Sequence, residues 1–330
     1  MSKLKLILFL ILATCIAYFS SLANPFIWDD EQFITSNVYV QQFDVGKIFT
    51  TNTIAGAGDV SNYYRPLTSL SFAIDAKIWR QNSFGFHLTN ISLHISSGVL
   101  LFLLLDAIGI GQLGSFFISL IFLIFPSQVE AVTFINSRGD SLYTAFLFLS
   151  LFLFFKAFRQ NKLSLFFWSF ICYMMSIFSK ETAISAFPLF FAITIFDRFT
   201  QRGKIFKMTK AFKRTIVFTC LSFAGVAVYM LLRLTVLNFS NTLNYYSEQT
   251  VYSSHLDIRL LTFARILWTY MGILLWPQSL HMERSIRLVT SIFSWEVWGI
   301  LLLFVAIVAF GIWEIRKKKS AFMLFGFFWA

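Results

Sequence analysis

Residues 4–22, LKLILFLILATCIAYFSSL, set the pattern that decides the fold: a long apolar run with one charged side chain, Lys5. A helix of about 20 apolar residues crosses the roughly 30 Å hydrocarbon core of a bilayer. Similar runs recur at residues 86–105, 113–125, 141–155, 163–178, 183–196, 215–237, 260–276 and 295–313. The sequence therefore predicts an all-α, polytopic transmembrane bundle of about nine to ten membrane segments, with exoplasmic loops and short interfacial helices.

The composition indicates a chain that lies in a membrane. Of its 330 residues, 57% are hydrophobic and 13% are charged, and the mean hydropathy is +0.71. Soluble domains are about half apolar and about a quarter charged. The net charge of +11 would suggest a nucleic-acid partner if the basic residues formed one surface. They lie between the apolar runs instead, which argues against nucleic acid and predicts a lipid bilayer around the chain.

The basic clusters predict the topology, because cytoplasmic loops carry an excess of lysine and arginine. Lys3 and Lys5 place the N-terminus in the cytoplasm. Segment 24–85 carries more acids than bases and is expected outside, as the first exoplasmic loop. Three clusters between apolar runs are expected in the cytoplasm: Lys156, Arg159 and Lys162; Arg198, Arg202, Lys204, Lys207, Lys210, Lys213 and Arg214; and Arg316, Lys317, Lys318 and Lys319.

A single transmembrane domain is expected over residues 1–330, with an acidic motif in loop 24–85. Residues 4–22 are longer than the usual signal-peptide core of about 7 to 15 residues, so we interpret them as a retained first helix. Because the chain stops inside an apolar run, we expect it to be a C-terminally truncated piece of a longer protein. Residues 260–276 and 295–313 would both run inward, so one of them, or the stretch around Pro277, is expected to be re-entrant or interfacial.

The three cysteines, Cys15, Cys172 and Cys220, all fall inside apolar runs. None has the loop position of an extracellular disulfide or the spacing of a zinc site. We expect three buried, inert thiols.

Ionisable residues at the edge of a membrane are costly and are therefore functional candidates. Asp29, Asp30 and Glu31 follow Trp28 directly after the first apolar run. Adjacent carboxylates repel one another, which can leave one protonated and another ionised, as a general base or a metal site requires. The alternative interpretation is a solvated acidic helix cap.

Two further groups follow in the sequence. Arg65, beside Tyr64, could hold a phosphate through two parallel hydrogen bonds, or could simply extend toward lipid headgroups. His87, Asn90 and His94 share one helix face. The two histidines are spaced too widely for the i, i+4 zinc pattern, so packing or hydrogen bonding is their expected role.

The remaining charged candidates are Glu130, Arg138 and Asp140 in the second outside stretch, and Lys180 and Glu181 at the next outside turn. Structural ion pairs explain these residues about as well as catalysis does. Because the alternation of helices puts all of these groups on one side of the membrane, we expect one exoplasmic site built from several loops.

Short motifs that combine aromatic, charged and polar residues lie at the ends of the apolar runs: Trp28-Asp29-Asp30, Tyr64-Arg65-Pro66-Leu67, Gly85-Phe86-His87-Leu88 with Asn90 and His94, Phe125-Pro126, Glu130-Ala131-Val132, Ser137-Arg138 with Asp140, and Lys180-Glu181. Weaker signals follow at Arg233, Arg259, Tyr270, Trp276-Pro277 and Leu280. In this order the motifs resemble the membrane O-mannosyltransferases that carry C-terminal tetratricopeptide repeats. That family is a branch of the GT-C glycosyltransferases, related to the protein O-mannosyltransferases and the bacterial aminoarabinose transferase.

The resemblance covers most of the chain and implies a GT-C type fold and a hexosyltransferase. Such an enzyme transfers a mannose-like sugar, with inversion, from a polyprenyl-phosphate-linked donor to an acceptor hydroxyl on a protein or glycan. The family's first exoplasmic loop carries Asp followed by Asp or Glu, with an aromatic residue a few positions on. Asp29, Asp30 and Phe33 match this pattern, which implies Asp29 and Asp30 as the catalytic residues. Asp29 is the first candidate for the base, and its neighbour Asp30 is the second. Because Glu31 follows directly, the acidic pair of the family could also correspond to Asp30 and Glu31.

The resemblance also implies roles for the other candidates. Arg65 is the expected ligand of the lipid phosphate, and the family's histidine before the Glu-Ala-Val stretch is replaced here by Ser127 or Gln128. No cofactor is predicted, although a divalent metal at Asp29 and Asp30 is left open. The expected donor-phosphate and substrate-binding residues are Arg65, Tyr64, His87, Glu130, Arg138, Asp140, Lys180 and Glu181.

A polytopic transporter or a lipid or glycan flippase is the alternative function. Polar groups near the membrane midplane would then mark the substrate path, whereas the charges here lie at helix ends and in the first outside loop. A structural or receptor-like scaffold would not concentrate acidic and arginine motifs on one face. The expected location is the bacterial inner membrane, or the endoplasmic reticulum membrane in a eukaryote, with the active site exoplasmic.

Overall fold

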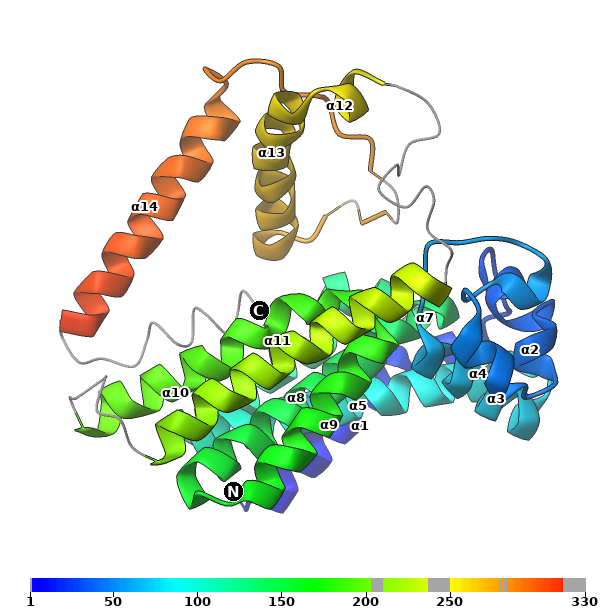
Figure 1. Cartoon of the computed structure of the whole chain (residues 1–330), viewed down its shortest axis with the longest axis horizontal. Coiled ribbons are helices and arrows are strands. Elements are labelled where there is room, and N and C mark those ends of the chain that lie inside the picture. The colour runs from blue at the N-terminus through cyan, green and yellow to red at the C-terminus, as the bar shows by residue number, and fades with distance from the viewer. Residues whose placement is uncertain (1, 203–209, 237–249, 279, 282–283, 317–330) are drawn as a thin grey trace. The chain divides into compact units, whose positions relative to one another are not determined.

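The computed structural model describes residues 2–202, 210–236, 250–278, 280–281 and 284–316 (Figure 1). These residues form helices and connecting segments, without a strand among them. The chain divides into two compact units, residues 1–198 with 204–239 and residues 199–203 with 240–330. The all-α class predicted from the apolar runs is confirmed.

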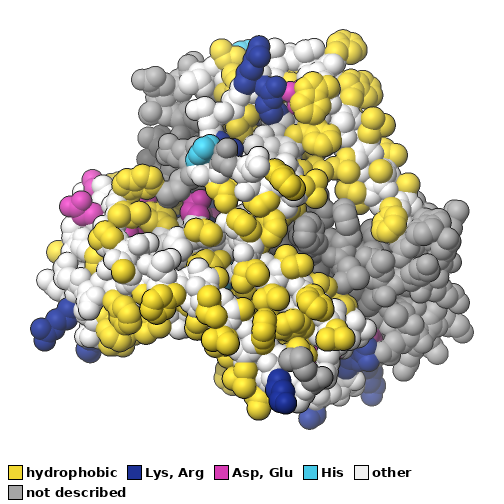
Figure 2. Space-filling model, turned by 180° about the vertical axis from the view of Figure 1, so that it is seen from behind, with side chains coloured by type: hydrophobic (Ala, Val, Ile, Leu, Met, Phe, Trp, Pro, Cys, Tyr) yellow, Lys and Arg dark blue, Asp and Glu magenta, His cyan; other side chains and the backbone are white. Residues whose placement is uncertain are grey.

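The first unit is a bundle of apolar helices (Figure 1). Its described helices at the predicted runs are α1 (Lys3–Tyr18), α5 (Ser83–Ile108), α6 (Gln112–Ile124), α8 (Arg138–Gln160), α9 (Leu163–Ser179), α10 (Phe187–Arg202), which extends past the division between the units, and α11 (Lys210–Val236). Hydrophobic side chains cover much of the face shown in Figure 2, and most of the lysine and arginine side chains in this view lie toward its edges.

Five helices of the described chain are long and apolar enough to cross a membrane: Lys3–Ala23, Ser83–Ile108, Ile135–Gln160, Phe212–Val236 and Leu256–Leu275. A sixth candidate is the pair Gln112–Ile124 and Pro126–Thr133, which is bent by 50°. Shorter apolar helices lie at Leu163–Ser179, Glu181–Thr194 and Trp295–Ile307. Each predicted apolar run therefore falls on an apolar helix, and the fold is that of a multi-pass membrane protein.

Helices α5 and α8 lie at the centre of the bundle. Their most apolar stretches are 50% and 56% buried, compared with 28% for α1 and α11. Small residues let the helices approach closely, as is usual in membranes. The hydroxyl of Ser150 on α8 donates to the Ser169 carbonyl of α9 at 2.6 Å, and the hydroxyl of Ser169 donates to the Ser150 carbonyl at 2.8 Å. A Cβ at Gly98 would lie 2.4 Å from the Leu123 side chain, so a larger residue there would displace Leu123.

The first loop folds into a cap with its own hydrophobic core. Its elements are a single π-helical turn (Glu31–Thr35), α2 (Val38–Gln41), α3 (Val45–Thr50), a 3₁₀ turn (Ala55–Ala57) and α4 (Pro66–Trp79). Helix α4 begins with proline at its first turn, where the missing N–H costs no hydrogen bond. Phe72 and Ala73 of α4 pack in one cluster with Phe33 and Ile34 of the π-helical turn.

Two expectations from the sequence are corrected by the structure. Helix α8 begins at Arg138 and not near Ser141, so the second outside stretch is shorter than expected. Asp140 then lies in the first turn of α8, where a carboxylate interacts favourably with the helix dipole. Cys172 is buried as expected, but Cys15 and Cys220 are exposed, because α1 and α11 lie at the edge of the bundle and turn these thiols outward.

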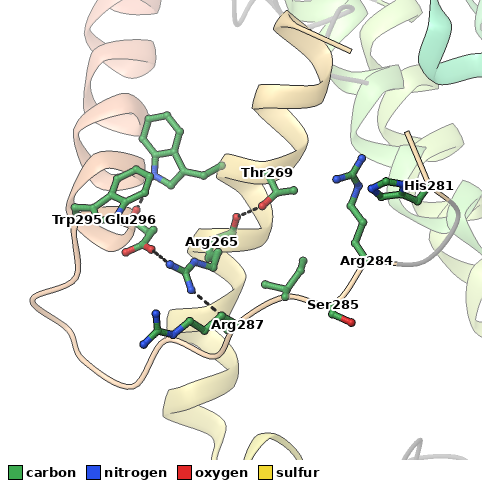
Figure 3. A pocket seen from close by; sticks show the side chains of 10 residues that line it. Arg265, Thr269, His281, Arg284, Ser285, Arg287, Trp295 and Glu296 are labelled. Carbon is green, nitrogen blue, oxygen red and sulfur yellow. Dashed lines mark hydrogen bonds and ion pairs between the residues drawn. The ribbon is translucent and has the colours of Figure 1, made fainter. Parts of the chain in front are cut away.

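The second unit contains α12 (Val251–Ser254), α13 (Leu256–Leu275) and α14 (Trp295–Arg316). Figure 1 shows α13 and α14 running in the same direction, so the segment between them must return along the helices. The backbone N–H of Val289 donates to the Thr262 hydroxyl at 3.0 Å, and Arg265 donates to the Arg287 carbonyl at 3.2 Å (Figure 3). The described residues of that segment, 277–278, 280–281 and 284–294, are not helical.

Candidate functional site

The acidic motif lies in a tight turn at the exit of the first apolar helix. Trp28 has a φ of 49°, a left-handed conformation that bulky residues rarely adopt. Its ring is exposed and contacts the edge of Phe134, with 6.4 Å between the ring centroids. The turn leaves Asp29 on the surface and Asp30 in the interior. The two adjacent carboxylates therefore have opposite environments.

Asp30 is a fully buried residue that joins the first loop to the segment before α8. One carboxylate oxygen accepts a hydrogen bond from the backbone N–H of Ile27 at 2.9 Å. The other accepts from the backbone N–H of Asn136, just before α8, also at 2.9 Å. Both oxygens are thus engaged by the backbone. The position of Asp30 is that of a residue that holds the acidic turn against the start of α8.

Asp29 is exposed, and its carboxylate forms no hydrogen bond or ion pair with another residue that the structure describes. Its backbone is nevertheless held, because its carbonyl accepts from the N–H of Phe33 at 3.0 Å and its neighbour Asp30 is clamped on both oxygens. A carboxylate on a fixed backbone with free lone pairs can accept a proton from a bound molecule. Of the two aspartates, Asp29 is the one whose carboxylate is open to a bound molecule.

The same contacts reduce the number of Asp30 lone pairs open to a divalent metal between the two aspartates. Such ions need several oxygen ligands, and both oxygens of Asp30 already accept backbone hydrogen bonds. Within the described ranges, no three His, Cys, Asp or Glu side chains converge as metal ligands.

Asp30 should make stability depend on pH. Burial, with a smaller contribution from the Asp29 carboxylate, raises the pKa of Asp30 from 3.8 to about 6, against the opposing effect of the two N–H donors and Arg138. Because the folded state binds this proton more tightly than the unfolded state, the contribution of Asp30 to stability is full below pH 3.8 and is lost as the pH rises through about 6.

We therefore expect the difference in Tm between the wild type and Asp30→Asn to decrease as the pH rises from about 4 to about 6.5. The asparagine does not titrate, so subtracting its melting curve removes the contribution of all other groups. Thermal unfolding in detergent across this range measures the difference. A constant difference would mean that Asp30 keeps one protonation state throughout.

Arg138 is fully buried and forms the centre of a polar network at the start of α8. Its guanidinium forms an ion pair with Asp75 of α4 at 2.6 Å and donates to the Asn90 side-chain carbonyl at 2.7 Å and to the Phe86 carbonyl at 3.0 Å. The ring of Phe72 lies 4.5 Å from the guanidinium carbon. Arg138 was expected to bind substrate, but it has no exposed surface and joins α4, α5 and α8.

Two ion pairs lie at the same end of the bundle. Arg65, at the start of α4, donates through Nε and Nη2 to the two oxygens of Glu181, at 2.9 and 2.6 Å. Lys180 contacts both oxygens of Asp140 at 2.6 and 2.7 Å. All four side chains are partly exposed. Glu130 is exposed and within electrostatic range of both Asp140 and Lys180.

Most of the charged candidates therefore converge, as predicted, on one part of the first unit. The Arg65–Glu181 pair joins α4 to the turn after α9, and the Lys180–Asp140 pair joins this turn to α8. Asp30 binds the segment that enters α8. The first loop, the start of α8 and the turn after α9 thus form one end of the bundle, which Asp29 shares.

Tyr64 and His87, two of the predicted substrate-binding residues, are buried and lie within hydrogen-bond distance of backbone carbonyls. Tyr64 is buried, and its hydroxyl donates to the Phe49 carbonyl at 2.9 Å. His87 is buried, with Nε2 at 3.1 Å from the Asn24 carbonyl. Asn90 and His94 also bond to carbonyls of neighbouring segments, as expected for packing residues. None of the four presents a free polar group at the surface.

The sequence reasoning missed Asp75, the ionic partner of Arg138. It lies in α4, within PLTSLSFAIDAKIW, and it is buried. Its second oxygen accepts from the hydroxyl of Thr89 at 2.9 Å. A carboxylate inside a largely apolar helix is a signal that could have identified it, since such a residue needs a partner.

Comparison with known proteins supports the resemblance inferred from the motifs. The chain is 26% identical over 213 residues to a protein O-mannosyl-transferase of Caenorhabditis elegans, covering 61% of this chain and 30% of that protein. It is 26% identical over 305 residues to the protein O-mannosyl-transferase Tmtc1 of Drosophila melanogaster, covering 87% of this chain and 35% of that protein. It is 34% identical over 148 residues to the protein O-mannosyl-transferase TMTC1 of Homo sapiens, covering 43% of this chain and 17% of that protein.

These matches confirm a similarity to named protein O-mannosyl-transferases. The chain matches about a third, or less, of the length of each of these relatives. No family model matches the chain, and no solved structure gives a significant match.

Proposed function

We propose that the chain is the membrane-embedded part of a glycosyltransferase that moves a mannose-like sugar from a polyprenyl-phosphate-linked donor to a hydroxyl group on a protein. The observation that carries this proposal is the exposed carboxylate of Asp29, which lacks a partner among the described residues, beside the clamped Asp30. The similarity to protein O-mannosyl-transferases supports the sugar and the protein acceptor. The apolar helices support a donor carried on a membrane lipid.

In the proposed reaction, the acceptor oxygen attacks the anomeric carbon of the sugar. A new C–O bond forms as the bond between that carbon and the phosphate oxygen breaks, and the electron pair leaves with the polyprenyl phosphate. Attack from the face opposite the phosphate inverts the configuration. Asp29 takes the proton of the acceptor hydroxyl, which makes a poor nucleophile reactive.

The proposal is tested with membranes that contain the chain, a polyprenyl-phosphate mannose donor and a peptide rich in serine and threonine. We expect mannosylated peptide and an equal amount of released polyprenyl phosphate. A transporter or flippase would move the donor between leaflets and leave its phosphate–sugar bond intact. Translocation of intact donor without release of lipid phosphate would therefore replace the proposed function with that alternative.

We propose that the site lies on the exoplasmic face, on the basis of the distribution of basic clusters. Lys162 is exposed after α8, and Val60 is 86% exposed in the first loop. In a variant without native cysteines, Val60→Cys should react with an impermeant thiol reagent in intact cells, and Lys162→Cys only after the membrane is opened. The reverse pattern would invert the topology. Lys204 and Lys318, which belong to the predicted cytoplasmic clusters, lie outside the described residues.

Arg65 is proposed as a ligand of the donor phosphate, although its guanidinium is paired with Glu181. A phosphate would have to replace or share the Glu181 contact, since both groups bind the same guanidinium fork. We expect Arg65→Ala to weaken donor binding at least tenfold and Arg65→Lys to weaken it partly, because lysine keeps the charge and loses the fork.

Glu181→Gln separates this role from a structural one. If Arg65 binds phosphate, releasing it from Glu181 should leave donor affinity unchanged or improve it. If the pair only holds α4 against the turn after α9, Glu181→Gln should weaken donor binding as much as Arg65→Ala does. Titration of a non-transferable donor analogue, with protein stability measured in parallel, distinguishes the two outcomes.

A further inference from the structure

Trp28 is a large aromatic residue that the fold leaves exposed beside the candidate base. It is 70% exposed, and it directly precedes Asp29 in the turn at the exit of the first apolar helix. Glu31 is exposed in the same turn. A flat apolar ring therefore lies next to two exposed acidic residues, and the proposed reaction has given this ring no role.

The backbone of Trp28 is held in a left-handed conformation by hydrogen bonds on both sides. Its φ of 49° costs free energy in a bulky residue, and such strain persists only where neighbouring contacts enforce it. The N–H of Asp30 donates to the Ile27 carbonyl at 3.0 Å, and the N–H of Glu31 donates to the Trp28 carbonyl at 3.1 Å. The turn thus fixes the point from which the indole extends, directly beside Asp29.

The orientation of the Trp28 ring is set by Phe134. The two rings lie edge to face, with an angle of 77° between their planes, an arrangement that the charge distribution of aromatic rings favours. Phe134 is buried, and Asn136 of the same segment donates its N–H to Asp30. The ring and the acidic turn are therefore held against one segment, while most of the Trp28 surface stays accessible.

A tryptophan near a membrane can also anchor a protein among the lipid headgroups. That role needs an amphipathic ring at the right level, and a residue with relaxed backbone angles fulfils it equally well. It gives no reason for a strained backbone directly before the acidic motif. Strain of this kind clusters at active sites and ligand clamps, so a bound ligand accounts for Trp28 better than a lipid anchor does.

We propose that Trp28 binds the sugar of the donor, by stacking its ring against the C–H face of a hexose. The C–H groups of that face carry partial positive charge, which the negative face of an indole attracts. The sugar hydroxyl groups lie at the rim of the hexose and stay open to water and to polar groups of the turn. The inference rests on the proposed function, because it names the residue that places the anomeric carbon near the Asp29 base.

The donor sugar suits this ring better than the protein acceptor does. Both must approach Asp29 during transfer, but the side chains around an acceptor hydroxyl vary from one peptide to another. A hexose always presents the same rigid C–H face, and a ring on a fixed backbone is matched to a ligand of constant shape. Binding of the acceptor peptide is kept as an outcome of the test.

The test compares two lipids of equal charge, polyprenyl-phosphate mannose and polyprenyl methyl phosphate, each titrated by calorimetry into the purified chain in detergent. Both are phosphodiesters, so the ratio of their dissociation constants isolates the contribution of the sugar. We expect the wild type to bind the mannose-bearing lipid about tenfold more tightly, the order that an aromatic contact contributes. Trp28→Gly should bind both lipids equally, with its affinity for polyprenyl methyl phosphate unchanged.

The choice of substitutions separates the ring from the fold. Glycine adopts a φ of 49° without strain, so Trp28→Gly removes the ring and should leave the chain folded, which its Tm checks. Trp28→Phe keeps a smaller ring and should keep part of the preference for mannose, whereas Trp28→Leu should lose it. The matched control is Ile27→Ala, at an exposed apolar residue of the same turn, which should leave both affinities unchanged.

An intact preference for the mannose-bearing lipid in Trp28→Gly would overturn the inference. Equal losses of affinity for both lipids would also overturn it, as would a rise in KM for the acceptor peptide with the lipid preference intact. Release of lipid phosphate by the wild type is measured separately. Its absence would refute the proposed transfer, while a preference for mannose that depends on Trp28 would still assign the ring to a sugar.

Discussion

Asp29→Asn is expected to lower the rate of sugar transfer by about 10²- to 10⁴-fold at saturating donor, the range that a positioned general base contributes. The amide keeps the size of the carboxylate and removes its basicity. Asp29 is exposed and has no partner among the described side chains, so the substitution breaks no observed contact. Donor affinity and Tm should therefore remain near their wild-type values.

The control for Asp29→Asn is Glu31→Gln. Glu31 is exposed in the same acidic cluster and loses the same charge in this substitution. If the cluster acts through its overall negative charge, the two variants should lose activity equally. If Asp29 is the base, Glu31→Gln should remain within about threefold of wild type. Release of polyprenyl phosphate in a single-turnover assay measures both variants.

An Asp29→Asn variant that transfers sugar within threefold of wild type would remove Asp29 as the base and would leave the proposed function without its main observation. Asp30→Asn is a poorer probe, because each oxygen of Asp30 accepts a backbone N–H and an amide would turn one acceptor into a donor. Its activity would change together with its stability. Measuring turnover and Tm on the same samples therefore distinguishes the role of Asp29 from that of Asp30.

The fold could be predicted from the sequence because a membrane demands long apolar segments with satisfied backbones. That requirement identified the helices and located the first loop. It could not identify which helices lie in the centre. Helices α1 and α5 are both strongly apolar, but the most apolar stretch is 28% buried in α1 and 50% buried in α5. The exposed thiols Cys15 and Cys220 follow from the same ambiguity: apolar means buried in a soluble core, but can mean lipid-facing here.

The sequence predicted which residues belong to the candidate site, but not which of them form ion pairs with one another. Residue type and helix alternation indicated that Arg65, Asp140 and Glu181 share one end of the bundle. The Arg65–Glu181 and Lys180–Asp140 contacts join residues distant in sequence, which no local spacing reveals. The difference between Asp29 and Asp30 depends on a left-handed Trp28 and on the backbone of Asn136. A single sequence carries no signal for either.

A substitution at Arg138 should cost considerable stability. Its guanidinium is buried against Asp75, which is also buried, and against Asn90 and the Phe86 carbonyl. Breaking a buried ion pair by removing one partner typically costs about 3 to 5 kcal/mol, because the remaining charge is left uncompensated. We therefore expect Arg138→Met to destabilise the chain by about this amount in a denaturant titration in detergent.

A second substitution tests the reason for this loss. Asp75→Asn in the Arg138→Met background removes the orphaned charge and keeps an acceptor for Thr89, so the double variant should regain at least half of the lost stability. Arg80→Met, at an exposed arginine of the same cap, should change stability by less than about 0.5 kcal/mol. If Arg138 binds substrate instead, KM for the donor should rise in Arg138→Met while stability is unchanged, and Asp75→Asn should restore nothing.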